Sequence, residues 1–258
     1  MNFYCYNNWH CGDNLFIRPL VIKLIELGHR VIIGCRSSMR YLFLDLEKKG
    51  VSIIDSTVPD INLETLCPPN HTKIDTWLGR TWRTGKFIGM SWKNMIEVFN
   101  EQSPDVTLEY TGDVPLLDFN TDVDIYVPKK AIYLDNTVCT GPHSNFNFNI
   151  EHISKTFTNL NFVCTGNPRI RRGNILDYSS NNLVELSIIS EKCLGILGKG
   201  SGPYVCTITS KNINKPRALC GITKFFLKPC WPHSKDITKF LNTMDEVFDF
   251  IKSIETQI

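Results

Sequence analysis

Residues 3–35 read FYCYNNWHCGDNLFIRPLVIKLIELGHRVIIGC, and this stretch decides the expected fold. It begins with a short apolar segment, Phe3–Tyr6, and continues through the polar loop Asn7–Asn14. Leucines then recur at roughly helical spacing up to Gly28, and a run of β-branched residues follows at Val31–Ile33. A strand, a loop, a helix and a buried strand in this order predict a parallel βαβ unit.

The same alternation continues outward from this stretch. Before residue 111 we expect a helix at 39–49, a strand at 51–55, a helix at 91–100 and a strand at 105–110. The segment 111–130 is rich in proline, glycine and aspartate and is the candidate hinge. After it we expect strands at 131–134, 161–164, 194–197 and 217–220, helices at 149–157 and 182–193, a short helix after the motif 198–203, and a final helical pattern over 237–251. The sequence predicts an α/β protein of two Rossmann-like halves, 1–125 and 126–258.

Composition narrows the function classes. The 258 residues carry 28 Lys and Arg against 26 Asp and Glu, a formal net charge of +2, so bulk binding to nucleic acid is not expected. No apolar run reaches the roughly 18 residues that a transmembrane helix needs. The first residues lack the pattern of a signal peptide. We therefore expect a cytoplasmic chain without a transmembrane segment.

The ten cysteines are scattered and form no CxxC pair, so no metal site is predicted. No bound cofactor is expected either. Several lie inside apolar runs, such as Cys164 and Cys220, and are expected to be buried, reduced thiols. Disulfides in an oxidising compartment are the alternative.

The first motif with chemical content is Trp9-His10-Cys11-Gly12-Asp13, between the first predicted strand and helix. Parallel sheets bind ligands at the carboxyl ends of their strands, and a carboxylate at the start of the next helix points there. Asp13 can therefore serve as a general base towards a sugar hydroxyl, with His10 beside it to orient it or to contact the acceptor. The alternatives are that Asp13 caps the helix and that His10 is an ordinary loop histidine.

The second motif is Gly198-Lys199-Gly200-Ser201-Gly202-Pro203, between a predicted strand and a short helix. Its glycines let the backbone approach a phosphate, and the helix N-terminus offers N–H groups and a partial positive charge. Ser201 adds a hydroxyl and Lys199 a cation. The motif is not a P-loop, because no Gly-Lys-Ser/Thr follows at the required spacing. The alternative is a glycine-rich turn with Pro203 at the start of the helix.

Together the two motifs resemble those of the heptosyltransferase-like glycosyltransferases, glycosyltransferase family 9. At the N-terminus the resemblance rests on Gly12-Asp13 after a strand, followed by Pro19 six residues after the aspartate. A proline inside a helix costs roughly 3 kcal/mol, so its placement is informative. At the C-terminus the resemblance rests on Ser201-Gly202-Pro203 and on Lys215-Pro216 ahead of the strand Ala218-Leu219-Cys220.

The resemblance implies a GT-B fold, in which the parallel sheets of the two Rossmann-like halves face a cleft. It implies an inverting, metal-independent transfer, in glycan biosynthesis, from a nucleotide-diphospho-sugar to a glycan or other hydroxyl acceptor, with Asp13 as base. The acceptor would bind mainly to the N-terminal half, and the Ser201 turn would hold the diphosphate. The chain departs from the family at Gly200, where an acidic residue is usual, and at Val205, where a histidine often stands.

Further candidates follow predicted strands. Candidate donor contacts are His143 and Thr165-Gly166-Asn167, whose loops follow strands of the second half. Gly12 is a candidate acceptor contact. Arg80 and Arg83 with Trp77 and Trp82 could form an acceptor wall, because the aromatic faces of tryptophans suit the C–H surface of a sugar. An ordinary turn, surface loop or core position is the alternative for each.

Two other functions stay open. A sugar epimerase or dehydrogenase would share the α/β fold, although no GxGxxG motif follows the first strand. A non-catalytic GT-B-like protein that binds a nucleotide or a glycan is compatible with the departures at Gly200 and Val205. The sequence does not identify the sugar, the nucleotide base or the acceptor.

Overall fold

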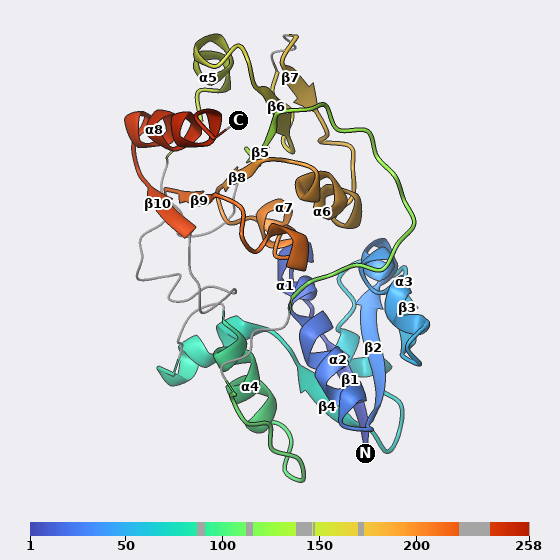
Figure 1. Cartoon of the computed structure of the whole chain (residues 1–258). Helices are drawn as coiled ribbons and strands as arrows, with labels where there is room; N and C mark the ends of the chain where they lie inside the picture. The colour runs from blue at the N-terminus through green and yellow to red at the C-terminus, as the bar shows by residue number, and fades with distance from the viewer. Residues whose placement is uncertain are drawn as a thin grey trace. The chain divides into compact units, whose positions relative to one another are not determined.

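The computed structural model describes residues 1–86, 91–111, 116–137, 146, 148–169, 173–221 and 238–257. The chain divides into two compact units (Figure 1). Unit 1 spans Met1–Thr121, and unit 2 holds the described residues from Asp122 onward. Each unit is built on a parallel sheet of its own, as the predicted α/β class with two Rossmann-like halves requires.

Unit 1 contains a four-stranded sheet in the order β3-β2-β1-β4. Its strands are β1 (Asn2–Tyr6), β2 (Arg30–Arg36), β3 (Ser52–Ser56) and β4 (Thr72–Asp75). β4 was not predicted from the sequence, because Ile74 is its only apolar residue and gives no alternating pattern. The chain adds β2 and β3 on one side of β1 and then returns to add β4 on the other. The pair β1–β4 is therefore the topological switch point of unit 1, where α/β sheets bind ligands.

The helical segments of unit 1 are shorter than predicted. They are α1 (Cys11–Leu15), α2 (Ile17–Glu26), η1 (Ser37–Leu42), α3 (Leu44–Glu47), η2 (Leu63–Leu66), η3 (Leu78–Thr84) and α4 (Trp92–Asn100), the η segments being 3₁₀ helices. The break at Phe16 between α1 and α2 places Pro19 in the first turn of α2, where its missing N–H costs no helical hydrogen bond. The single helix predicted over 39–49 is wrong: Phe43, at φ −126°, separates η1 from α3.

The strand predicted at 105–110 is also wrong. Leu108 donates its backbone N–H to Oδ1 of Asn100 and accepts from Nδ2 of the same side chain, both at 2.8 Å. The amide at the end of α4 thus takes the backbone groups that a neighbouring strand would need.

A buried ion pair fixes the last residues of unit 1. Arg18 is fully buried in α2, and its two terminal nitrogens each lie 2.7 Å from a carboxylate oxygen of Asp45. The same guanidinium donates to the carbonyl of Asp118 at 2.9 Å and lies 4.3 Å from the centre of the Phe119 ring. The backbone N–H of Asn120 donates to Asp45 at 3.2 Å. The ion pair therefore holds segment 118–120 against α2 and α3.

Unit 2 contains a six-stranded parallel sheet in the order β10-β9-β8-β5-β6-β7. Its strands are β5 (Ala131–Asp135), β6 (Asn161–Cys164), β7 (Ile175–Asp177), β8 (Gly195–Gly198), β9 (Arg217–Cys220) and β10 (Thr238–Leu241). This is the order of the doubly wound Rossmann sheet, with its switch point between β5 and β8. The strand order of unit 1, β3-β2-β1-β4, matches the first four strands of that Rossmann order.

Helices lie on both faces of the unit 2 sheet (Figure 1). They are α5 (Ile150–Thr156), α6 (Leu183–Glu191), α7 (Gly202–Val205), the 3₁₀ turn η4 (Ser210–Asn212) and α8 (Met244–Glu255). Ile132 and Leu134 of β5 share one buried cluster with α5 and α8. The alternate residue Tyr133 points to the other face, where its hydroxyl donates to the carbonyl of Pro203 in α7 at 2.6 Å.

The helical pattern predicted over 237–251 is only partly correct. Residues 238–241 form β10, which pairs with β9, so the helix starts later, at Met244. Thr243 caps it, and Glu246 completes a capping box by accepting from the Thr243 backbone N–H at 3.1 Å.

The eight cysteines that the structure describes are free thiols, and six of them are buried. Burial raises the pKa of Cys35, Cys164 and Cys193 to about 12. Within the described ranges, no cluster of His, Cys, Asp and Glu could hold a metal ion. No helix in that part of the chain combines the length and apolarity needed to cross a membrane.

Candidate functional site

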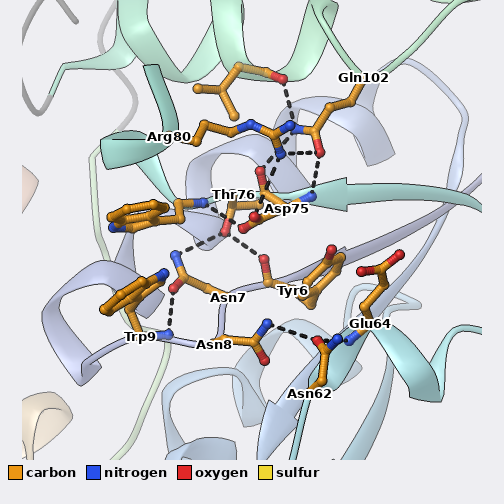
Figure 2. Close-up of polar contacts among 12 residues, drawn as sticks. Tyr6, Asn7, Asn8, Trp9, Asn62, Glu64, Asp75, Thr76, Arg80 and Gln102 are labelled. Atoms are coloured by element: carbon orange, nitrogen blue, oxygen red, sulfur yellow. Dashed lines mark hydrogen bonds and ion pairs between the residues drawn. The ribbon is translucent and has the colours of Figure 1, made fainter. Parts of the chain in front are cut away.

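Two matching turns lie at the switch point of unit 1. β1 and β4 end in register, with Tyr6 opposite Asp75. The backbone N–H of Trp9 donates to Oδ1 of Asn7 at 2.9 Å, and the N–H of Trp77 donates to Oδ1 of Asp75 at 3.1 Å. Each strand thus ends in an Asx turn with a tryptophan two residues after the Asn or Asp. Figure 2 shows both turns.

The two turns are joined to each other. The Asn7 amide donates to the hydroxyl of Thr76 at 3.3 Å, and that hydroxyl donates to the Tyr6 carbonyl at 3.0 Å (Figure 2). The indoles of Trp9 and Trp77 stack with their ring centres 4.5 Å apart and their planes at 24°. Trp9 is nevertheless 43% exposed. The carboxyl edge of β1 and β4 therefore carries an ordered aromatic surface.

An ion pair and an amide lie beside these rings. Gln102 accepts from the Asp75 backbone N–H at 2.9 Å and from Arg80 at 2.6 Å, and its amide donates back to the Asp75 carbonyl at 2.9 Å (Figure 2). The guanidinium of Arg80 lies 3.6 Å from the Asp75 carboxylate. Burial raises the pKa of Asp75, while the Trp77 N–H and the Arg80 charge oppose that shift. Arg80, a predicted acceptor contact, thus belongs to this edge.

Asp13 lies in the first turn of α1, and His10 holds the N-cap position. Burial raises the pKa of the Asp13 carboxyl, opposed by the His10 ring and by hydrogen bonds from the backbone N–H groups of His10 and Asp13. The fully buried Asn14 fixes the preceding loop, since its amide donates to the carbonyls of Trp9 at 3.2 Å and His10 at 3.1 Å. Gly12 is half-buried beside Asp13.

At the switch point of unit 2, a buried carboxylate organises the loops. Asp135 is fully buried at the end of β5, opposite Gly198 of β8. One oxygen accepts from the Ser201 hydroxyl at 2.6 Å. The other accepts from the Thr165 hydroxyl and the Thr137 backbone N–H, each at 3.2 Å. Asp135 thus joins the loops that follow β5, β6 and β8.

The glycine-rich turn is tied to β5 by this contact. Ser201 is the N-cap residue of α7, but its hydroxyl accepts no helical N–H and instead donates to Asp135. Gly200 has φ +77°, a conformation that favours glycine. Lys199 is half-buried in the same turn, and Gly202 and Pro203 form the first residues of α7.

The structure brings together some of the other predicted residues. Gly166 exchanges two hydrogen bonds with the Asn136 side chain, at 2.6 and 2.7 Å, so the loop after β6 lies beside the loop after β5. Asn167 accepts from the backbone N–H of Arg169 at 2.9 Å, which forms a local turn. His143 lies outside the described residues. Trp82 is 50% exposed in η3, whereas Trp77, the other tryptophan of this segment, stacks on Trp9.

Most of the residues that organise the two strand edges were not identified from the sequence. Asp135 directly follows the apolar run Ala131–Leu134, and a carboxylate at that place is the signal that could have identified it. Asp75 had no comparable signal, because β4 itself was not predicted. Trp77 was considered only as part of a wall with Arg80, Arg83 and Trp82. Trp9 was read only as part of the Asp13 motif.

No protein-family model and no curated protein matches this sequence. Among solved structures, the chain is similar to the E. coli heptosyltransferase WaaC with ADP-2-deoxy-2-fluoro heptose, with a TM-score of 0.59 and 12% identity over 98% of this chain and 99% of WaaC. WaaC with ADP gives 0.58 and 10% identity, over 98% of this chain and 97% of that one. The iron-containing dodecameric glycosyltransferase TibC from enterotoxigenic E. coli gives 0.56 and 12% identity, over 92% of this chain and 61% of TibC. The chain therefore has the GT-B fold of the heptosyltransferases, as the resemblance implied.

Proposed function

We propose that this chain is a glycosyltransferase that moves a sugar from a nucleotide-diphospho-sugar to a hydroxyl of a glycan or other acceptor. One observation carries the proposal. The turn at the switch point of unit 2 is held by a buried carboxylate, on a fold shared with WaaC structures that contain ADP and an ADP-heptose analogue. Since a shared fold alone does not assign a function, the reaction must be tested on this chain.

The donor would bind to unit 2. Its diphosphate would lie on the turn Lys199–Pro203, where backbone N–H groups and the Lys199 ammonium can stabilise the charge that develops as the nucleotide leaves. These groups would stabilise the negative charge of the leaving diphosphate, as a metal ion does in other transferases. We therefore propose a metal-independent reaction. Thr165, Gly166, Asn167 and His143 are the further proposed donor contacts.

The acceptor would bind to unit 1, with Asp13 as base. The Asp13 carboxylate would remove the proton from the acceptor hydroxyl, whose oxygen then attacks the anomeric carbon on the side opposite the diphosphate and inverts its configuration. The raised pKa of Asp13 supports this role, because a base works best when its pKa approaches the working pH. Gly12, His10, Arg80 and Trp82 are the proposed neighbours of the acceptor.

A thermal-shift panel with UDP, GDP, ADP, CMP and dTDP, with and without EDTA, tests the donor site first. We expect one diphosphate to raise the melting temperature, equally with and without EDTA, and Ser201→Ala to reduce the rise. ADP is the expected ligand, given the WaaC complexes. No shift with any nucleotide contradicts the proposal.

The competing function is a GT-B-like protein that binds a nucleotide or glycan without turnover. It is favoured by Gly200 and Val205, which stand where the resembling family carries an acidic residue and often a histidine. This competing function would be supported if the chain binds a nucleotide but neither hydrolyses the matching nucleotide-sugar nor transfers its sugar to any of a panel of glycan acceptors.

A further inference from the structure

We propose that the stacked pair Trp9–Trp77 is a platform that binds a pyranose ring of the acceptor. The inference rests on the proposed function and names the chemical class that unit 1 recognises. The sequence grouped Trp77 with Trp82 in a candidate sugar-stacking wall, whereas Trp9, on which Trp77 stacks, was read only as part of the Asp13 motif. Trp9 and Trp77 both reach the switch point through Asx turns at the ends of β1 and β4.

Trp9 presents an exposed aromatic surface in a fixed position. Its backbone N–H donates to the Asn7 side chain, its carbonyl accepts from the amide of the fully buried Asn14, and its ring stacks on Trp77. Even so, 43% of the residue stays exposed. A ring that is already ordered binds a ligand with little loss of conformational entropy. The faces of a pyranose ring carry C–H groups, which pack against such a surface.

Trp77 is supported from the chain that follows it. A Cβ atom built on Gly79 would lie 2.5, 2.6 and 2.9 Å from three atoms of the Trp77 indole. The indole therefore packs directly against the Gly79 backbone, and no other residue type fits there without moving the ring. Trp77 thus packs against the Gly79 backbone as well as against the Trp9 ring, and these two contacts fix its position.

The charges beside the platform favour a neutral, hydroxyl-rich ligand. Arg80 lies 3.6 Å from Asp75, and Lys73 lies 3.2 Å from Glu64, so the charge of each cation is offset by a carboxylate. A phosphate would need an excess of positive charge and a cationic ligand an excess of negative charge. A sugar hydroxyl can donate to the Asp75 carboxylate, which also accepts from the Trp77 backbone N–H, and can accept from the Arg80 guanidinium beside it (Figure 2).

Saturation-transfer difference NMR on the full chain tests the platform, with methyl glycosides of glucose, galactose and mannose as probes. We expect transfer to the ring C–H protons of at least one probe, and a loss of fivefold or more in Trp9→Ala. Trp9→Phe should retain part of the signal. Gly79→Ala keeps both indoles but displaces Trp77, and should also weaken binding. Tyr126→Ala, which removes a 77% exposed aromatic ring from unit 2, is the matched control and should have no effect.

Equal transfer in wild type and in a folded Trp9→Ala variant, or no transfer from any probe, overturns the platform. The same samples are titrated with ADP. If ADP still binds while Trp9→Ala binds the pyranosides normally, the platform is wrong and the proposed transferase stands. If the wild type binds no nucleotide, the proposed function fails whatever the pyranosides show.

Discussion

Single carboxyl groups determine the chemistry proposed for this chain. Asp13 and Asp75 are half-buried, and this burial raises the pKa of each carboxyl. Asp135 is fully buried, and its carboxylate takes hydrogen bonds from three groups. The first two are thus suited to contact a ligand or to exchange a proton, and the third to hold loops in place. Residue type alone does not separate these roles, since all three are aspartates near strand ends.

The substitution Asp13→Asn should separate catalysis from stability. As the proposed base, Asp13 should account for a roughly 10²–10⁴-fold part of kcat, so turnover should fall by that factor. Affinity for the nucleotide should stay unchanged, as measured by the thermal shift. A variant that turns over at the wild-type rate would contradict the assignment of the base.

The same substitution should stabilise the fold at neutral pH. The pKa of Asp13 is higher in the folded chain than in the unfolded chain, so the folded state binds more protons and its stability falls as pH rises through the folded pKa. Asparagine removes this loss. The melting temperature of Asp13→Asn should exceed that of the wild type at pH 7, and the difference should vanish below the unfolded pKa of about 3.9.

At the scale of elements, the turn between β8 and α7 has a backbone that its sequence constrains. Gly200 adopts φ +77°, and Gly28, after α2, adopts φ +80° with open space around it. An alanine held in this left-handed backbone conformation costs about 1–2 kcal/mol at either position. Both Gly200→Ala and Gly28→Ala should therefore lower stability by a similar amount in denaturant unfolding. Only Gly200→Ala should also weaken nucleotide binding, by tenfold or more, and equal affinity in both variants would contradict a donor role for the turn.

Elements with a strong local pattern were predictable from the sequence, and those held by distant contacts were not. β1, β2, β5 and β8 carry runs of apolar residues that no other assignment fits. β4, β7 and β10 were missed, because in each the pairing with a neighbouring strand outweighs a weak, short or helix-like pattern. The motifs around Asp13 and Ser201 were visible in the sequence. Their supports, Asn14 and Asp135, depend on the fold and became identifiable only with the loops in place.

At the scale of the whole molecule, the stability of each unit depends on its own buried contacts. In unit 1, one such contact is the buried ion pair between Arg18 and Asp45. Removing one partner of a buried ion pair costs about 3–5 kcal/mol, so Asp45→Ala should lower the free energy of unfolding of unit 1 by that amount. Glu47→Gln, two residues along the same helix, breaks a pair whose side chains are 37% and 38% exposed and should change little. Urea unfolding followed by tryptophan fluorescence measures both.

The direction in which the stabilising effect of Asp45 changes with pH follows from its pKa shift. Burial alone would raise the pKa of Asp45, but hydrogen bonding to Arg18 and its charge bring it below the ordinary value. Its contribution is therefore present above the unfolded pKa of about 3.9 and is lost as pH falls through the folded pKa. The stability difference between wild type and Asp45→Ala should shrink over that acidic range, and a difference that does not depend on pH would contradict the ionic origin.

The six buried thiols among the described residues can be used to measure local opening of the native chain. Cys5 and Cys35 lie in strands of unit 1, and Cys164, Cys193, Cys206 and Cys220 lie in unit 2. Only a thiolate reacts with an alkylating reagent, and burial keeps these groups protonated and covered. Each becomes reactive only when the strand or helix around it opens. Pulsed alkylation followed by peptide mass spectrometry can therefore record the opening of each unit separately, without an engineered label.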